Sequence, residues 1–311
     1  MARYRNDLPL LTGGIFLSDG GLETTLVFQR GIDLPHFAAF PLLDDAAGRA
    51  VLTAYFTVYL EMARAHGLGF VLDTPTWRAN PDWAARLGYD AAALSALNRR
   101  AVAFAAALRD AWERPGQPIV LNGMIGPRGD GYKDGRMEPD EAQAYHAGQI
   151  ADFAVAGADM VSALTMNNVG EAIGIARAAR AAGMPCAISF TVETDGRLAG
   201  GLTLREAIER TDAATGAAPA FYMVNCAHPT HFDTALPQGE AWARRIGGIR
   251  ANSSTRSHAE LDDATELDAG DPADLGARYR ALRRQHPGLR MLGGCCGTDH
   301  RHLQAICEAC L

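Results

Sequence analysis

The chain has 311 residues, of which 48% are hydrophobic, and it carries a net charge of −7. A chain of this length can bury a large core, and as one domain it fits few folds, barrels among them. The acidic balance argues against a nucleic-acid-binding protein, which would carry a basic face, and no apolar run approaches the roughly 18 residues that span a membrane.

Short apolar runs recur along the chain, and they predict buried strands. The predicted strands cover residues 15–18, 69–73, 119–123, 160–163, 186–190, 221–225, 247–251 and 290–293. Ala-rich segments with helical periodicity lie between them. The predicted helices cover residues 49–66, 91–112, 139–156, 169–182, 204–215, 272–285 and 298–309, the last capped by Thr298 or Asp299, whereas residues 230–245 carry the weakest helical pattern.

The order of these elements predicts an α/β fold, a (β/α)₈ or TIM barrel, in a single domain that spans residues 1–311. The alternative is an open doubly wound sheet. Such a sheet usually begins with a Gly-rich phosphate loop, and no G-x-G-x-x-G follows the first predicted strand. The barrel is therefore the favoured interpretation.

Three of the six cysteines follow predicted strands, Cys226 after the sixth and the adjacent pair Cys295 and Cys296 after the eighth. In a barrel the C-terminal ends of all strands meet at one face, so we expect these three side chains to converge. Residues 1–11 have mixed charges and Pro9 where a signal peptide would have its apolar run, which predicts a cytoplasmic, reducing location. Cysteines in that location are more often ligands or catalysts than disulfides.

Three converging thiolates favour zinc, which takes four ligands and would keep one position open for a substrate. Zn²⁺ with three thiolates carries a net charge of about −1, so it activates water poorly but can still hold a bound thiol as thiolate. The pattern therefore favours alkylation of a thiol over hydrolysis. A zinc hydrolase on the same barrel would use His and carboxylate ligands, and no H-x-H follows the first predicted strand. A non-catalytic zinc or thiol binder stays open.

Simpler explanations exist for the individual cysteines. Cys226 alone would fit a buried apolar position. The Gly-Gly-Cys-Cys-Gly run is harder to explain that way, because core strands rarely need so many glycines. Cys186 lies inside a predicted strand and is assigned to the core. The C-x-x-C formed by Cys307 and Cys310 is interpreted as incidental, because no second C-x-x-C accompanies it.

Four motifs spread along the chain carry a resemblance to a known family. They are Ser-Asp-Gly-Gly at 18–21, Gly-Pro at 126–127, Asn-Cys at 225–226 and Gly-Gly-Cys-Cys-Gly-Thr at 293–298. Together they resemble the zinc-dependent homocysteine S-methyltransferase family. The resemblance implies a (β/α)₈ barrel with one zinc held by the three cysteines. It also implies a transferase that moves a methyl group from a sulfonium or ammonium donor to homocysteine, giving methionine, with the zinc-activated substrate thiolate as the nucleophile.

The resemblance also implies roles for residues around the metal. The loop of Asp19, Gly20 and Gly21 would hold the amino-acid end of homocysteine through backbone N–H groups, although Asp19 also fits a turn or a helix cap. Asn225 would brace the zinc ligand beside it. Trp77, after the second predicted strand, could face a cationic donor through a cation–π contact, and it fits packing equally well.

One position departs from the family pattern. Relatives usually carry a glutamate after the fourth strand that faces the substrate ammonium, and here that position is Leu164, beside Thr165, which we also count as a substrate contact. Glu23 and Glu193 are the candidates to replace the missing carboxylate. The competing hypothesis is a thiol acceptor other than homocysteine. The expected partners are a small thiol and a methyl donor, and whether the chain forms a homo-oligomer is not readable from the sequence.

Overall fold

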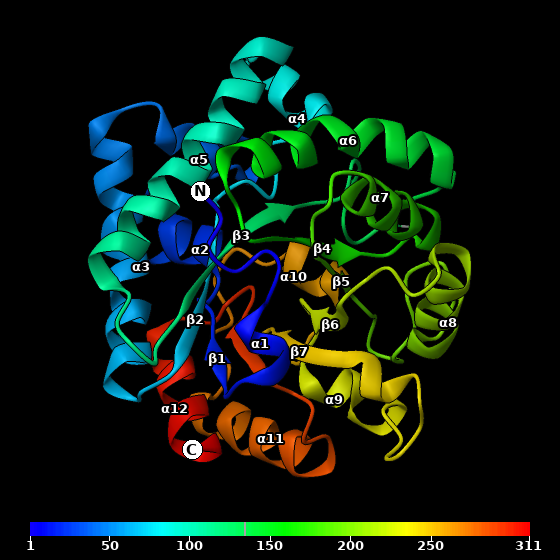
Figure 1. The fold of residues 1–311 in the computed structure, drawn as a ribbon. Helices are drawn as coiled ribbons and strands as arrows, with labels where there is room; N and C mark the ends of the chain where they lie inside the picture. The colour runs from blue at the N-terminus through cyan, green and yellow to red at the C-terminus, as the bar shows by residue number, and fades with distance from the viewer. Residues whose placement is uncertain (134) are drawn as a thin grey trace.

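The computed structural model describes residues 1–133 and 135–311, and its centre is a closed barrel of eight parallel strands in chain order. Figure 1 shows the strands in the middle of the molecule with the long helices around them. The strands are β1 (Phe16–Leu17), β2 (Gly69–Asp73), β3 (Ile119–Ile125), β4 (Met160–Met166), β5 (Cys186–Phe190), β6 (Phe221–Asn225), β7 (Ile246–Ala251) and β8 (Met291–Gly294). The predicted barrel is confirmed, and the open sheet is wrong because β8 pairs with β1.

The long helices lie where the periodicity predicts them. They are α3 (Ala46–Ala65), α5 (Ala91–Trp112), α6 (Pro139–Ala156), α7 (Val169–Ala181), α8 (Leu204–Thr215), α11 (Pro272–Gln285) and α12 (His300–Cys310). Side-chain caps explain where several of them begin: Asp90 accepts from the Ala93 N–H, and Thr203 forms a capping box with Glu206. Asp299 is the cap of α12, as one of the two predicted options had it. Within the described part of the chain, no helix is both long enough and apolar enough to cross a membrane.

The segment with the weakest helical pattern, residues 230–245, does not form one helix. It holds α9 (Pro229–Phe232) and the short 3₁₀ turns η4 (Asp233–Ala235) and η5 (Ala243–Arg245). Pro237 and the left-handed Gly239 interrupt it, because neither residue continues a helix. The structure also contains seven short elements that the sequence patterns did not predict, and η1 directly continues α2. They are α1 (Pro9–Thr12), α2 (Leu22–Thr24), the π-helical η1 (Thr25–Gln29), η2 (Pro35–Phe37), η3 (Phe40–Leu43), α4 (Pro81–Arg86) and α10 (His258–Asp262).

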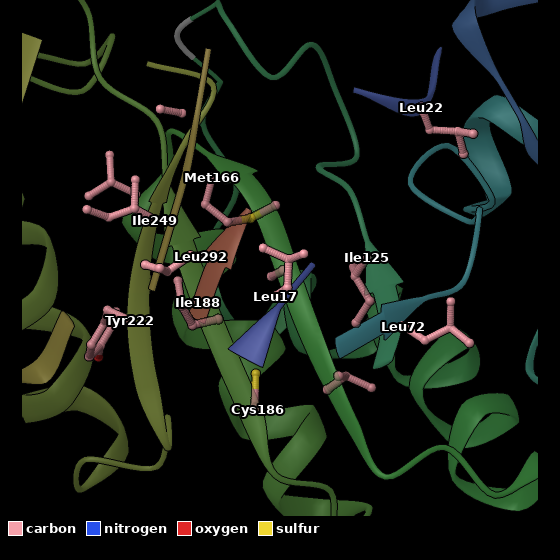
Figure 2. Packing of buried hydrophobic residues seen from close by; sticks show 14 of the residues in the cluster. Leu17, Leu22, Leu72, Ile125, Met166, Cys186, Ile188, Tyr222, Ile249 and Leu292 are labelled. Carbon is pink, nitrogen blue, oxygen red and sulfur yellow. The ribbon is translucent and has the colours of Figure 1, made fainter. Parts of the chain in front are cut away.

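Two apolar layers follow from the alternation of side chains along each strand. Outward-facing strand residues pack against the helices, and Figure 2 shows members of this layer such as Leu17, Ile188 and Leu292. Inward-facing residues form a second cluster inside the barrel, which includes Phe16 and, toward the C-terminal ends of the strands, Leu164. The barrel interior is therefore packed, and any substrate site must lie above it.

Candidate metal and substrate site

The three predicted cysteines converge at the C-terminal ends of β6 and β8. Their sulfur atoms all lie within 4.8 Å of one another. Cys226 and Cys295 form a disulfide in this structure, and the Cys296 Sγ lies 4.0 Å from the Cys226 Sγ. Tetrahedral zinc with Zn–S bonds of about 2.3 Å would space its sulfurs by about 3.8 Å. The Cys226–Cys296 separation is close to that spacing, and the reduced Cys295 would no longer be bonded to Cys226, so the donor set fits one zinc ion.

The free thiol of Cys296 also indicates a role for a cation. Its pKa is raised to about 11, mainly by burial and then by the charge of Glu23, while the Tyr132 hydrogen bond opposes the shift. A thiol in these surroundings stays protonated at neutral pH unless a positive charge lies beside it. A metal ion would supply that charge.

Unusual backbone conformations present the site residues. Cys226 has a φ of 52° and Thr165 a φ of 62°, both in the left-handed region that residues other than glycine seldom adopt. Such strain persists at functional sites, where neighbouring groups hold it in place. Here the Asn252 side chain donates to the Cys226 carbonyl at 3.1 Å. Gly294 is required for a different reason, because a Cβ there would lie 2.0 Å from the Thr298 Oγ1.

Asn225 links the cysteines to β4 and β5. Its Oδ1 accepts from the Ser189 hydroxyl at 2.6 Å and from the Thr165 N–H at 2.9 Å. Its Nδ2 donates to the Thr165 hydroxyl at 2.9 Å and lies 3.8 Å from the Cys295 Sγ. The bracing role predicted for Asn225 fits this geometry, although the sulfur that it contacts is that of Cys295 and not of its neighbour Cys226.

A cavity of about 410 Å³ opens above the cysteines. Its volume is in the range of small-molecule sites. Glu193, predicted at the same face, is not among the lining residues that the structure describes. The predicted residues that line the cavity are Asp19, Gly20, Gly21, Glu23, Trp77, Leu164, Thr165, Asn225, Cys226, Cys295 and Cys296.

The two candidate glutamates have different surroundings. Glu23 lies in the cavity wall, where burial raises its pKa to about 7, with Asp19 adding to the shift and Arg250 opposing it. The pKa of Glu193 is also raised, by partial burial and then by Asp195, but its side chain lies outside the cavity. Of the two, Glu23 is therefore placed to meet a substrate.

Two aromatic residues that line the cavity, Trp77 and Tyr132, already have partners within the protein. The guanidinium of Arg78 lies 4.1 Å from the centre of the Trp77 ring and 3.9 Å from that of Trp83, so one face of Trp77 holds a protein cation. The Tyr132 hydroxyl donates to the Cys226 Sγ at 3.4 Å, and its ring packs on His258 at 4.4 Å between centroids. Tyr132 thus covers the sulfurs, and a donor contact with Trp77 stays a prediction.

Arg250 is a site residue that the sequence reasoning missed. It is 4% exposed and lies in the cavity wall, in register with Asn225 and Gly293 on the neighbouring strands. Its Nη2 pairs with the Asp19 carboxylate at 2.5 Å, its Nη1 pairs with Asp73, and its Nε donates to the Gly294 carbonyl at 3.1 Å. A lone arginine in the apolar run 247–251 was the available signal, because a charge on a buried strand needs partners.

Opposite charges hold this cluster together. Burial raises the pKa of Asp19 to about 6, with Arg250 opposing the shift and Asp73 adding to it. Burial alone would lower the pKa of Arg250, but the two aspartates outweigh it and the pKa lies above its usual value. Arg250 therefore stays charged.

Gly126, from the Gly-Pro motif, packs directly against Trp77 of the cavity wall. A Cβ at this position would lie 2.1 Å from the Trp77 carbonyl oxygen, whereas one at Gly129 in the same loop would meet nothing within 4 Å. We expect Gly126→Ala to lower the free energy of unfolding by about 1–3 kcal/mol, since backbone atoms must move apart. Gly129→Ala is the matched control and should change it by less than about 0.5 kcal/mol. Urea unfolding followed by circular dichroism measures both, and equal values would contradict the steric explanation.

Comparisons with known proteins agree with this geometry. Residues 16–310 match the sequence pattern of a family described as homocysteine S-methyltransferase. No curated protein matches the chain. The structure resembles that of the homocysteine methyltransferase MmuM from Escherichia coli in three forms. For the metallated form the TM-score is 0.73 at 23% identity, covering 98% of this chain and 99% of that one. The oxidized form gives 0.74 at 23% identity with the same coverage, and the apo form gives 0.66 at 22% over 96% of each. At these identities the likeness shows a shared fold.

Proposed function

This chain belongs to the homocysteine S-methyltransferase family, and we propose that it methylates the sulfur of homocysteine with the help of a zinc ion held by Cys226, Cys295 and Cys296. The family and the enzyme class expected from the four motifs are confirmed by the match over residues 16–310. The observation that carries the metal assignment is the convergence of three sulfurs, within 4.8 Å of one another, under a cavity of substrate size.

In the proposed methyl transfer, the residues around the sulfurs would orient a metal ligand, limit the access of water and hold the two substrates together. When bound, zinc would supply the positive charge that keeps an acceptor sulfur as a thiolate at neutral pH. The Asn225 amide, 3.8 Å from the Cys295 Sγ, orients that ligand. Tyr132 lies beside the sulfurs, with its ring packed on His258, and would limit the access of water to them. The cavity walls hold acceptor and donor in contact, which lowers the barrier to displacement.

The charge of the cavity supports a cationic methyl donor. Several carboxylates line its rim and would attract a sulfonium or an ammonium compound through the summed field of the site. Those rim residues are Asp130, Asp262, Glu266 and Asp268. We propose a donor of this charge class.

Product analysis with a labelled donor tests the proposed function. Reduced, zinc-replete protein is incubated with L-homocysteine and either S-methylmethionine or glycine betaine carrying a ¹³C-methyl group, and methionine is analysed by mass spectrometry. The label is needed because demethylated S-methylmethionine is itself methionine. Labelled methionine derived from homocysteine supports the proposal. No labelled product with either donor, from protein that binds zinc, would favour a non-catalytic zinc or thiol binder.

Glu23 is our candidate for the substrate ammonium, because Leu164 lies in the apolar interior of the barrel and cannot pair with a cation. Glu23→Gln should raise the homocysteine KM about 10- to 100-fold, the worth of a hydrogen bond to a charged group, with a smaller effect on kcat. Glu193→Gln is the control and should leave both constants within about 2-fold. Steady-state kinetics on the two variants decides, and two unchanged KM values would sink the proposal.

A reducing environment is part of the proposal. The three thiols bind metal as thiolates, and a disulfide between Cys226 and Cys295 removes two of them. The cytoplasmic location expected from the sequence is consistent with that requirement and stays a prediction.

A further inference from the structure

Arg250 has hydrogen-bonding capacity that the described part of the chain does not use. A guanidinium carries five N–H groups. Among the described residues, three acceptors meet it, one on each nitrogen: the Gly294 carbonyl on Nε, Asp73 on Nη1 and Asp19 on Nη2. One N–H of each terminal nitrogen is left, on a side chain that is 4% exposed and lines the cavity. Two N–H groups on one planar fork match the geometry of a carboxylate.

The loop expected to bind the substrate carboxylate through its backbone has one of its N–H groups, that of Gly21, engaged elsewhere. The resemblance assigns this role to N–H groups of the loop at Gly20 and Gly21. The Gly21 N–H donates to the Thr298 carbonyl at 3.0 Å, and the Tyr59 hydroxyl lies so close to Gly20 that a Cβ there would meet it at 2.8 Å. A carboxylate accepts several hydrogen bonds, so it needs donors besides this loop, and Arg250 lines the same cavity.

The charge of the cluster restricts what Arg250 can accept. One guanidinium and two carboxylates, those of Asp19 and Asp73, sum to a net charge of −1 (+1 − 2). A ligand carboxylate that brings no counter-ion would change the net charge of this buried cluster from −1 to −2, which is energetically costly. An α-amino acid carries its own ammonium and leaves the total unchanged. The cluster thus favours a zwitterion over a simple thiol acid.

Resting on the proposed function, we propose that Arg250 determines acceptor specificity by binding the carboxylate of a zwitterionic thiol amino acid through its two free N–H groups. The carboxylate would lie against Arg250, and the ammonium would face the acidic side of the cavity at Asp19 and Glu23. The alternative is that Arg250 only braces the barrel mouth by joining β7 to β1, β2 and β8.

Three thiols that differ by one group separate these roles. L-homocysteine carries both charged groups, 3-aminopropane-1-thiol lacks the carboxylate, and 4-mercaptobutanoate lacks the ammonium. Calorimetry gives the Kd of each thiol for reduced, zinc-loaded wild-type protein and for the variants Arg250→Lys and Arg250→Gln. Arg109→Met is the matched control, because Arg109 is a buried arginine paired with Asp159 at 3.0 Å and does not line the cavity.

The expected result is selective. Wild-type protein should bind homocysteine about 10- to 100-fold more tightly than 3-aminopropane-1-thiol, and 4-mercaptobutanoate least tightly. Both Arg250 variants should lose about 10- to 100-fold for homocysteine and less than about 3-fold for 3-aminopropane-1-thiol. Arg109→Met should keep the wild-type ranking while its melting temperature falls.

Other results would overturn the inference. If the Arg250 variants lose affinity equally for L-homocysteine and for 3-aminopropane-1-thiol, Arg250 only braces the barrel mouth. The same conclusion follows if wild-type protein binds these two thiols with equal affinity. If Arg250→Gln does not fold, Arg250→Lys decides, because it keeps the charge and removes the planar fork. If Arg250 proves to be only a brace and wild-type protein still forms labelled methionine, the specificity inference is wrong and the proposed function is retained. Wild-type protein that neither binds nor methylates homocysteine would instead overturn the proposed function.

Discussion

Replacement of Cys296 or Cys226 by alanine is expected to lower bound zinc from about one equivalent to less than about a tenth, because two thiolates do not hold the ion at a site built for three. Methyl transfer should fall at least about 1000-fold. Without the metal, a thiol with a pKa near 8.5 is only a few per cent ionised at neutral pH, and it is no longer held against the donor. Elemental analysis of the purified reduced proteins gives the metal content, and product formation gives the rate.

The C-terminal cysteines provide the control for this experiment. Cys307 is buried in α12 and packs in the outer apolar layer, away from the cavity. Cys307→Ala should keep full zinc occupancy and activity, with some loss of stability from the smaller side chain. Zinc that persists at half an equivalent or more in Cys226→Ala and Cys296→Ala would defeat the assignment of the ligands.

The barrel and the sulfur site are predictable because their signals are local. Each strand is a short apolar run beside a helical segment, and β2, β5 and β6 begin and end at the predicted residues. The C-terminal end of every strand lies at one face, so Cys226 and Cys295 converge whatever the details of packing. Glycines next to Cys295 mark the close approach, since a Cβ on Gly294 would strike Thr298.

The substrate wall is less predictable because its contacts join distant parts of the chain. Arg250 lies 231 residues from Asp19 and 177 from Asp73 in sequence, and no local pattern pairs them. The same limit applies to Glu193, which follows a strand at the correct face and yet lies outside the cavity. Strand order gives the face of a barrel, whereas side-chain direction at its rim depends on packing.

Asp159 is expected to stabilise the N-terminal end of the barrel, opposite the cysteines. Its buried carboxylate accepts from the backbone N–H groups of Arg3 at 2.6 Å, Tyr4 at 2.9 Å and Leu121 at 2.9 Å, and it pairs with the Arg109 guanidinium at 3.0 Å. Asp159→Asn should lower the free energy of unfolding by about 3–5 kcal/mol, because Arg109 would keep a buried charge with no counter-ion. For a chain of 311 residues the melting temperature should fall by roughly 5–8 °C.

Asp110→Asn is the control for Asp159→Asn, because Asp110 pairs with Arg3 at an exposed position. This substitution should lower the free energy of unfolding by less than about 1 kcal/mol. Zinc content and the homocysteine KM of folded Asp159→Asn should equal those of the wild type, because contacts at the N-terminal face of a barrel serve stability and the chemistry lies at the other face. Calorimetric melting and metal analysis on the same samples test both parts. A variant that melts normally, or one that keeps its stability and loses zinc, would contradict this division between the two ends of the barrel.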